Sequence, residues 1–178
     1  MSNKVEITYL DETGSTNDYA LDLVANSDFQ TDVAILAKKQ TSGRGRLNGR
    51  LWESPIGNFY CSYIINLSRL KISLSETNLL TFAIMKSLQK YLINLTSSEK
   101  ICVKIPNDIL VANKKLAGIL TEISYPYAVI GIGINLINSP IERATNLKDE
   151  FNLLVKPEEL VENLYKFLVD GITECYYL

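Results

Sequence analysis

The chain has 178 residues, is 47% hydrophobic, and carries a formal net charge of -2 with no histidine. This is enough apolar material for one compact domain with its own core, and the slightly acidic balance argues against general attraction to a polyanion. The lack of histidine excludes Ser-His-Asp and Cys-His mechanisms, so an enzyme with this sequence is expected to work by positioning and charge stabilisation.

The amino-terminal residues and the cysteines indicate the compartment. Charged residues occupy the start of the chain, where a signal peptide needs an unbroken apolar segment, and no later run approaches the roughly 18 apolar residues of a membrane helix. We therefore expect a soluble, cytoplasmic protein with no membrane partner. Cys61, Cys102 and Cys175 are odd in number and widely spaced, which predicts small core residues instead of disulfides or zinc ligands.

The first half of the chain predicts three strands and two helices. Residues 15–18 form a capping box that opens a helix through about Ala25, and residues 73–76 form a second one for a helix that ends near Ile93. The strands are expected at residues 5–10, 33–37 and 58–67. The apolar stripe of the second helix should lie on a sheet and consists of Leu80, Ile84, Leu88 and Leu92, widened by Leu79, Ala83 and Tyr91.

Four strands in succession are expected in the second half, at residues 101–105, 108–111, 116–124 and 128–136. Turn residues between them make an antiparallel meander the simplest connection. Pro157 begins a last helix that packs through about Val169. These elements predict an α+β fold in a single domain over residues 1–178. Its sheet is mainly antiparallel or mixed, with helices on one side and polar loops at the other.

The segment at residues 40–55, which we call the arginine loop, holds three arginines and three glycines. Between residues 38 and 50 there are five cations and no acid. In Gly43-Arg44-Gly45-Arg46, planar guanidinium groups can hold carboxylate or phosphate oxygens in pairs, and the glycines let the backbone approach a ligand. We expect this loop to bind a phosphate-bearing small molecule. Trp52 could order the loop, stack on a base or lie in the core.

Two further polar groups could complete a site. Ser15-Thr16-Asn17 either caps the predicted helix or holds a small polar ring, such as an ureido group, with its hydroxyls and amide. In the run at residues 104–108, a proline fixes a bend from which polar side chains project. Asp108 could coordinate Mg²⁺, and Lys104 and Lys115 could contact phosphate or acyl oxygens. An ordinary hairpin would use the same residues.

Gly131-Ile132-Gly133-Ile134-Asn135 could be mistaken for a dinucleotide fingerprint. Its glycines, however, alternate with β-branched residues inside a strand, and no helix opens after them. Alternating glycines leave one face of the strand bare, so a ligand, a helix or another subunit must pack there. If another subunit packs there, the chain would form a homodimer through the exposed sheet, which is a secondary hypothesis.

Together these blocks resemble the catalytic domain of the biotin protein ligases over roughly residues 5–170. The resemblance is carried by Ser15-Thr16-Asn17, Gln40, Gly43-Arg44-Gly45-Arg46, Trp52, residues 104–108, Lys115-Leu116-Ala117-Gly118 and residues 131–135. It implies a class II synthetase-like fold and a two-step reaction. The biotin carboxylate attacks the α-phosphorus of ATP, with Mg²⁺, to give biotinyl-5'-AMP. A lysine of a biotin carboxyl carrier protein then takes the biotinyl group.

The resemblance also implies a role for each matching residue. The expected catalytic residues are Arg44, Arg46, Lys115 and Asp108, the last also as a ligand of Mg²⁺. Biotin contacts are expected from Ser15, Thr16, Asn17, Gln40, Arg44, Gly45, Arg46, Lys115 and Gly118. Contacts to ATP or to the adenylate are expected from Arg46, Trp52, Lys104, Asn107, Asp108, Lys115 and Asn135. Lys115 would be the principal cation, between the biotin carboxylate and the α-phosphate.

The sequence departs from the family pattern in several places. The run between Arg46 and Trp52 is one residue longer than usual, which affects Arg50 and the register of Trp52. Ile105 stands where the family usually has tryptophan. No helix-turn-helix is expected before Val5, which argues against repressor activity. No SH3-like barrel is expected after the last helix, and its loss would affect turnover more than biotin binding.

Three alternatives stay open. A lipoate or octanoyl-protein ligase uses similar acyl-adenylate chemistry on a related fold, although the Gly-Arg-Gly-Arg run is not expected there. A non-catalytic biotin-binding remnant would keep the pocket without turnover. An RNA-binding domain could use the basic loop, but the Arg-Gly unit occurs once and no stacking aromatics are interleaved with the arginines, so nucleic acid is not an expected partner.

Overall fold

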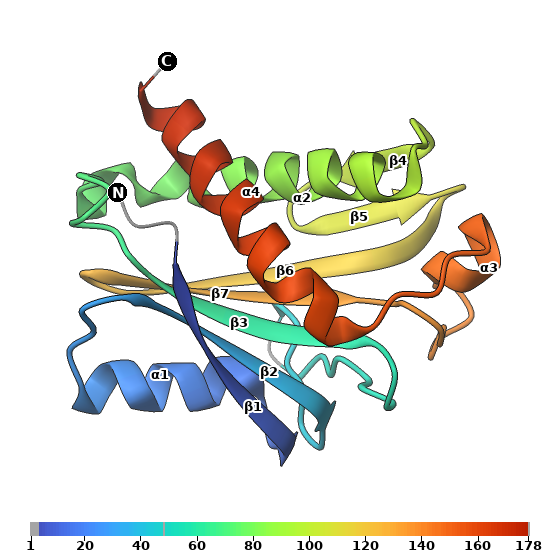
Figure 1. Ribbon diagram of the computed structural model, residues 1–178, viewed down its shortest axis with the longest axis horizontal. Coiled ribbons are helices and arrows are strands. Elements are labelled where there is room, and N and C mark those ends of the chain that lie inside the picture. Colours follow the sequence, from blue (N-terminus) through green and yellow to red (C-terminus); the bar gives the residue numbers. More distant parts are fainter. Residues whose placement is uncertain (1–3, 48, 178) are drawn as a thin grey trace.

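The computed structural model describes residues 4–47 and 49–177 of the chain. Within them, seven strands form one mixed sheet in the order β1-β2-β3-β7-β6-β5-β4 (Figure 1). The strands are β1 (Val5–Thr13), β2 (Asp32–Gln40), β3 (Phe59–Asn66), β4 (Ile101–Lys104), β5 (Asp108–Val111), β6 (Lys114–Ser124) and β7 (Tyr127–Ile134). The helices are α1 (Thr16–Asn26), the 3₁₀ helix η1 (Leu74–Leu79), α2 (Leu80–Thr96), α3 (Leu147–Phe151) and α4 (Pro157–Tyr177).

The predicted antiparallel meander is confirmed, because β4, β5, β6 and β7 pair antiparallel in succession. β3 pairs antiparallel with β7 on one side and with β2 on the other. β1 pairs parallel with β2 at the edge of the sheet, and α1 supplies the crossover that a parallel connection requires. The last strand of the meander therefore joins both halves of the chain into one sheet.

The prediction that helices cover one side of the sheet is wrong. α2 and α4 lie on one face, whereas α1 lies on the opposite face (Figure 1). On β7, Ile130 and Ile132 belong to the large core under α2 and α4. The side chain of Val129 points to the opposite face of the sheet from those of its neighbours in the strand. It packs with Ala20 of α1 in a smaller hydrophobic cluster. The central strands are apolar on both faces, and both faces therefore need cover.

Both expected helix starts are present, but the second differs in form. Ser15 caps α1, where its side chain accepts from the Asp18 amide at 3.5 Å. After Ser73, whose amide donates to the Glu76 carboxylate at 2.8 Å, the chain forms η1 before α2 begins. Because a 3₁₀ helix turns more tightly than an α-helix, Leu79 leaves the apolar stripe predicted for it and is 52% exposed. The rest of that stripe is buried.

The carboxy-terminal part holds more helix than expected. α4 continues to Tyr177, beyond the predicted end near Val169, and the short α3 lies outside the predicted elements. Cys61 is buried as predicted, but Cys102 and Cys175 are exposed, since β4 is an edge strand and the last turns of α4 extend past the core. Among the helices described here, none has the length and apolar character needed to cross a membrane.

Candidate active site

One cavity of about 550 Å³ lies on the face of the sheet that α1 covers, between the start of α1, the arginine loop and residues of β5, β6 and β7. Arg50, whose role the sequence left open, and Arg143, which no motif marks, also line it. The structure brings all of the predicted site residues to this cavity: Ser15, Thr16, Asn17, Gln40, Arg44, Gly45, Arg46, Trp52, Lys104, Asn107, Asp108, Lys115, Gly118 and Asn135.

The start of α1 and the end of β2 build one polar end of the cavity. Ser15, Thr16 and Asn17 are each at most 4% exposed. The Thr16 amide donates to Gln40 Oε1 at 2.8 Å, so the backbone of the helix start holds the side-chain amide of Gln40. Asn17 Nδ2 donates to Glu122 Oε2 at 2.8 Å. The helix cap and the polar pocket are therefore the same structure.

Ser62 of β3, which the motifs do not include, connects this polar end to the sheet. It is fully buried, donates to Asn17 Oδ1 at 2.6 Å, and has its Oγ 2.8 Å from Thr16 Oγ1. A signal for it exists in the sequence, since Ser62 is the one small hydroxyl residue within a run of apolar and aromatic residues at positions 59–65. A buried hydroxyl needs a hydrogen-bond partner.

Ser54, at the end of the arginine loop, connects the polar end to that loop. It accepts from Gln40 Nε2 at 2.9 Å and donates to the Trp52 carbonyl at 2.9 Å. Because Gln40 Oε1 is held by the helix start and Gln40 Nε2 by Ser54, the orientation of this amide is fixed from both ends.

The arginine loop folds back on itself as a small hairpin. The Gly45 amide donates to the Arg50 carbonyl at 2.7 Å, and the Trp52 amide donates to the Gly43 carbonyl at 2.8 Å. A Cβ on Gly43 would lie 2.6 Å from the Trp52 carbonyl oxygen, so this position requires glycine. Asn48, which belongs to the longer run noted in the sequence, lies outside the described residues.

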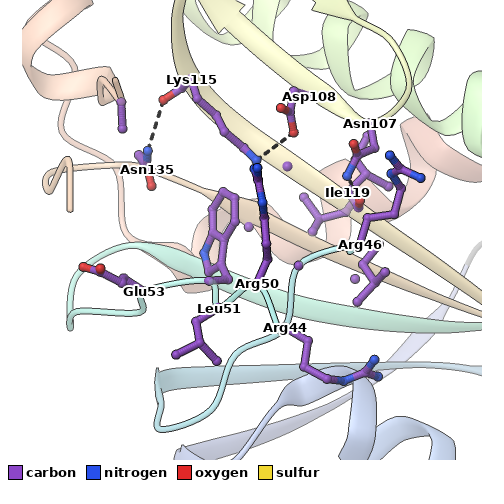
Figure 2. Close-up of a pocket in the computed structure, with 18 of the residues that line it drawn as sticks. Arg44, Arg46, Arg50, Leu51, Glu53, Asn107, Asp108, Lys115, Ile119 and Asn135 are labelled. Carbon is purple, nitrogen blue, oxygen red and sulfur yellow. Dashed lines mark hydrogen bonds and ion pairs between the residues drawn. The ribbon is translucent and has the colours of Figure 1, made fainter. Parts of the chain in front are cut away.

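Arg44 and Arg46 have different surroundings. Arg44 Nη2 lies 2.6 Å from Asp18 Oδ1 and 2.8 Å from Glu122 Oε2, so this side chain ties the loop to α1 and β6. Burial lowers the pKa of its guanidinium, but the hydrogen bonds to Glu122 and Asp18 outweigh burial and raise it. Arg46 is exposed and points toward Asn107 (Figure 2). The contact of Arg44 with biotin stays a prediction, whereas its anchoring contacts are present.

Lys115 lies at the centre of the cavity's basic side. Its Nζ is 2.7 Å from Asp108 Oδ1 (Figure 2) and 4.8 Å from the centroid of the Trp52 ring. Both contacts hold the ammonium group in place, the first by charge and the second by a cation–π interaction. An anionic ligand would therefore meet a cation that is already positioned, but it must compete with one carboxylate.

Trp52 lies against the bare strip that glycines leave on β6 and β7. A Cβ on Gly118 would come within 2.7 Å of this ring and one on Gly133 within 2.6 Å, while Asn17 covers Gly131 in the same way. Side chains of this chain therefore cover the strip. The bare strip was the reason to expect a homodimer, so that reason no longer applies, and the homodimer stays a prediction. Within the described part of the chain, Trp52 Nε1 is buried without a hydrogen-bond partner.

The amides predicted to face the nucleotide hold the backbone in place. Asn107 Nδ2 donates to the Ile119 carbonyl at 2.8 Å, and Asn135 Nδ2 donates to the Thr145 carbonyl at 3.0 Å. Lys104 is exposed at the rim. Direct contact of these three residues with ATP stays a prediction, and the two amides already have a role in shaping the cavity.

The fit of Mg²⁺ depends on Asp108. Within residues 4–47 and 49–177, no group of three or more acidic, histidine or cysteine side chains could hold a metal ion. Asp108 offers one carboxylate, and its Oδ1 is already paired with Lys115. Mg²⁺ is commonly held by one or two carboxylates together with substrate phosphates, so the residues fit an ion that arrives with a nucleotide rather than a preformed metal centre.

Comparisons with known proteins show which family this chain resembles. Residues 9–135 match the model of the biotin/lipoate A/B protein ligase family. The chain is 35% identical over 153 residues to the bifunctional ligase/repressor BirA of Bacillus subtilis, which covers 80% of this chain and 44% of that protein. It is 30% identical over 169 residues to the biotin–[acetyl-CoA-carboxylase] ligase of Paracoccus denitrificans, which covers 87% of this chain and 68% of that protein.

Among solved structures, the biotin protein ligase of Leishmania major in complex with biotinyl-5-AMP matches with a TM-score of 0.78 and 29% identity. The match covers 95% of this chain and 75% of that one. The fold is therefore shared over nearly the whole chain described here, whereas this chain spans less than half the length of the Bacillus subtilis relative.

Proposed function

The chain belongs to the biotin/lipoate A/B protein ligase family, and on this premise we propose that it activates biotin with ATP and transfers the biotinyl group to a lysine of a biotin carboxyl carrier protein. The Paracoccus denitrificans relative is a biotin–[acetyl-CoA-carboxylase] ligase, the Bacillus subtilis relative is a ligase and repressor, and the Leishmania major biotin protein ligase holds biotinyl-5-AMP. Since the chain spans only part of its relatives, the complete activity and the carrier protein are proposals for this chain.

The observation that carries the proposal is the position of Lys115. The cavity holds a polar pocket at the start of α1, and Lys115 Nζ lies in the same cavity beside Asp108 and Trp52. A small molecule with a polar ring in that pocket and a carboxylate at the end of an aliphatic chain would bring its carboxylate toward this cation. Biotin has this form.

In the proposed first step, a biotin carboxylate oxygen attacks the α-phosphorus of ATP, the bond to the β-phosphate oxygen breaks, and pyrophosphate leaves. The carboxylate is already a nucleophile, so the reaction needs no histidine base. Negative charge gathers at phosphorus, and Lys115 and Arg46 would offset it. Asp108 would hold Mg²⁺ together with phosphate oxygens, where the ion neutralises part of the phosphate charge.

In the proposed second step, the neutral amine of the acceptor lysine attacks the acyl carbon of biotinyl-5'-AMP. The amide bond forms, AMP leaves with the bonding electron pair, and the amine loses a proton to solvent. A mixed anhydride also reacts with water, so the site must exclude water until the acceptor arrives. The arginine loop, tied across the cavity by Arg44, is the element that would do this.

The alternatives fit less well. The Paracoccus denitrificans relative and the Leishmania major neighbour are named as biotin ligases, which does not favour a lipoate or octanoyl-protein ligase. For RNA binding, the basic segment would need free cations, yet Lys38 pairs with Asp11, Lys39 pairs with Glu12, and Arg44 is already held by two carboxylates. Much of the local positive charge is therefore neutralised within the chain, and a polyanion would find few partners.

Measurement of pyrophosphate release distinguishes a biotin ligase from a lipoate ligase and from a non-catalytic biotin-binding remnant. With ATP and biotin, the chain should release pyrophosphate, and with ATP and lipoate it should release little. Biotin binding without pyrophosphate release would indicate a remnant, and faster release with lipoate would overturn the assignment of biotin. ATP-dependent labelling of a biotin carboxyl carrier domain with biotin then tests the second step.

A further inference from the structure

A buried asparagine, Asn58, lies directly before β3 and holds the turn that follows β7. Its Oδ1 accepts from three successive backbone amides, those of Leu136 at 2.9 Å, Ile137 at 3.1 Å and Asn138 at 3.0 Å. The Asn58 residue is 0% exposed, so any effect that it has on a ligand must pass through its neighbours. One side chain therefore fixes the path of the chain as it leaves the sheet.

Asn58 and Asn138 tie two segments together. Asn58 Nδ2 donates to the Asn138 carbonyl at 3.0 Å, and Asn138 Nδ2 donates to the Ile56 carbonyl at 2.9 Å. Gly57 has a φ of +102°, and a Cβ at this position would lie 2.5 Å from Ile137 Cδ1, so the close approach of the two segments requires glycine here. Residues 56–58 and 136–138 thus form one unit, which we call the asparagine clasp.

The asparagine clasp reaches the cavity through Asn135, which lines it. Asn135 Nδ2 donates to the Thr145 carbonyl at 3.0 Å and to the Lys115 carbonyl at 3.3 Å (Figure 2). Because this nitrogen faces two carbonyls, the Asn135 oxygen is left on the side of Asn58, whose Nδ2 donates to it over a long contact of 3.5 Å. The orientation of the Asn135 amide is therefore set from both sides.

The turn held by Asn58 also leads into a wall of the cavity. Four residues of the segment after it line the cavity: Pro140, Ile141, Arg143 and Ala144. Beyond them the segment pairs with the start of β6, where the Lys115 amide donates to the Arg143 carbonyl at 2.8 Å and the Thr145 amide donates to the Lys115 carbonyl at 2.9 Å. The wall is thus anchored by Asn58 before it and by β6 at its end.

We infer that Asn58 is a positioning residue for ATP, which sets the affinity of the cavity for the nucleotide without touching it. Asn58 holds the amide of Asn135 and the start of the wall in one arrangement. This role rests on the proposed function, in which Asn135 lies on the adenylate side of the cavity. The ammonium group of Lys115 is held separately, by Asp108 and Trp52. ATP binding therefore depends on Asn58 more than the chemical step does.

The test is Asn58→Asp in the full chain. Aspartate keeps an oxygen for the three amides of the turn, but it places a second oxygen where Nδ2 faces the Asn135 oxygen and the Asn138 carbonyl. In steady-state pyrophosphate release, the KM for ATP should rise on the order of tenfold, as expected for one lost hydrogen bond between buried groups. The kcat should fall less than about threefold, since Lys115 keeps its own contacts. Calorimetry should give a dissociation constant for biotin within about twofold of the wild-type value.

Three further variants separate the route from charge and from folding. Asn58→Ser also lacks Nδ2 but adds no charge, and it should raise the KM for ATP in the same direction. Asn138→Asp adds a charge to the asparagine clasp and loses only the contact with the Ile56 carbonyl, so the KM should change less than about threefold. In Asn135→Ala, the added Asn58→Asp change should cause no further rise, because residues that act through one another are not additive.

The outcomes distinguish the role of Asn58 from the proposed function. If Asn58→Asp and Asn58→Ser leave the KM for ATP unchanged, or weaken ATP and biotin by the same factor, the positioning role is refuted, while biotin activation by the wild-type chain stands. A rise that persists in Asn135→Ala refutes the route through Asn135. If the wild-type chain binds ATP but releases no pyrophosphate with biotin, the proposed function falls, and calorimetric dissociation constants of ATP for the same variants decide the role of Asn58. A wild-type chain that binds no ATP overturns both.

Discussion

Gly131 and Gly133 of β7 both line the cavity, and each is covered by a different side chain, Asn17 and Trp52 respectively. A Cβ on Gly131 would come within 2.9 Å of Asn17 Cγ, and Asn17 cannot easily move because Ser62 and Glu122 hold both ends of its amide. Gly131→Ala should therefore cost about 1–3 kcal/mol of unfolding free energy. It should also weaken biotin binding by more than about tenfold, the equivalent of roughly 1.4 kcal/mol. Urea titration and calorimetry measure the two effects.

Gly133→Ala is the matched variant beneath Trp52. Its Cβ would lie 2.6 Å from the Trp52 ring, so the ring must shift away from Lys115. We expect a higher KM for ATP and a smaller change in the dissociation constant of biotin. If the two alanine variants affected both substrates alike, the division of the cavity into a vitamin end and a nucleotide end would be incorrect.

Lys115 should contribute mainly to adenylate formation. Lys115→Met keeps an aliphatic stem against Trp52 but removes the charge, and the loss of one positioned cation should lower the rate of pyrophosphate release by about 100–1,000-fold. Single-turnover pyrophosphate release measures this rate. The exposed neighbour Lys114 gives the control, since Lys114→Met should leave the rate unchanged. A normal rate for Lys115→Met would remove Lys115 from the mechanism.

The residues that the sequence predicts and those that it misses differ in a physical way. Arg44, Lys115 and their companions occur in short runs with unusual composition, and such runs can be recognised locally. Glu122 is a single acid in a strand, and its partners Arg44 and Asn17 are 78 and 105 residues away in the sequence. Ser62 has the same property. Pairs this distant leave no periodic signal, so only the fold reveals them.

Arg44 anchors the arginine loop to the rest of the site. Arg44 bridges from the loop to Asp18 at the start of α1 and to Glu122 on β6. Arg44→Met should release the loop and let water reach the adenylate, with pyrophosphate formation less affected. The ratio of pyrophosphate released to biotin transferred should rise about fivefold, since a partly exposed ion pair contributes on the order of 1 kcal/mol.

Asp18→Asn provides the graded control for this loop. It removes one of the two carboxylates that hold Arg44 and leaves Glu122 in place, so the ratio should rise less than in Arg44→Met. Measurement of pyrophosphate and of biotinylated carrier in the same reaction gives the ratio directly. An unchanged ratio in both variants would show that the loop does not depend on Arg44 to protect the adenylate.

Local sequence patterns predicted which segments form strands and helices better than they predicted where these elements pack in the fold. Alternating and continuous apolar runs marked the seven strands, and turn residues marked the meander, because these signals lie within a few residues. The side on which α1 packs was not predictable, since residues 32–37 of β2 and 59–65 of β3 are buried without alternation and therefore show no exposed face. α3 has five residues, which is too short for a helical period to appear.

The two faces of the sheet have different roles: one carries the large hydrophobic core and the other carries the candidate active site. The large core lies between the sheet and α2 and α4, whereas the cavity and the smaller cluster lie on the α1 face. Polar groups such as Thr16, Gln40 and Glu122 can therefore occupy the α1 face without interrupting the large core. Because the same strands form both faces, we expect the site and the large core to unfold together in one cooperative transition.

This shared sheet predicts one cooperative transition, which the single tryptophan can report. Trp52 fluorescence follows the cavity and far-UV circular dichroism follows the whole fold, so their urea transitions should coincide. Biotin at 100 times its dissociation constant should raise the unfolding free energy seen by both probes by about 2.7 kcal/mol. Lipoate at the same concentration should give no shift. A fluorescence change that precedes the loss of dichroism would mean that the cavity face unfolds separately, and the Ser62 and Glu122 contacts would then be too weak to couple the start of α1 to the sheet.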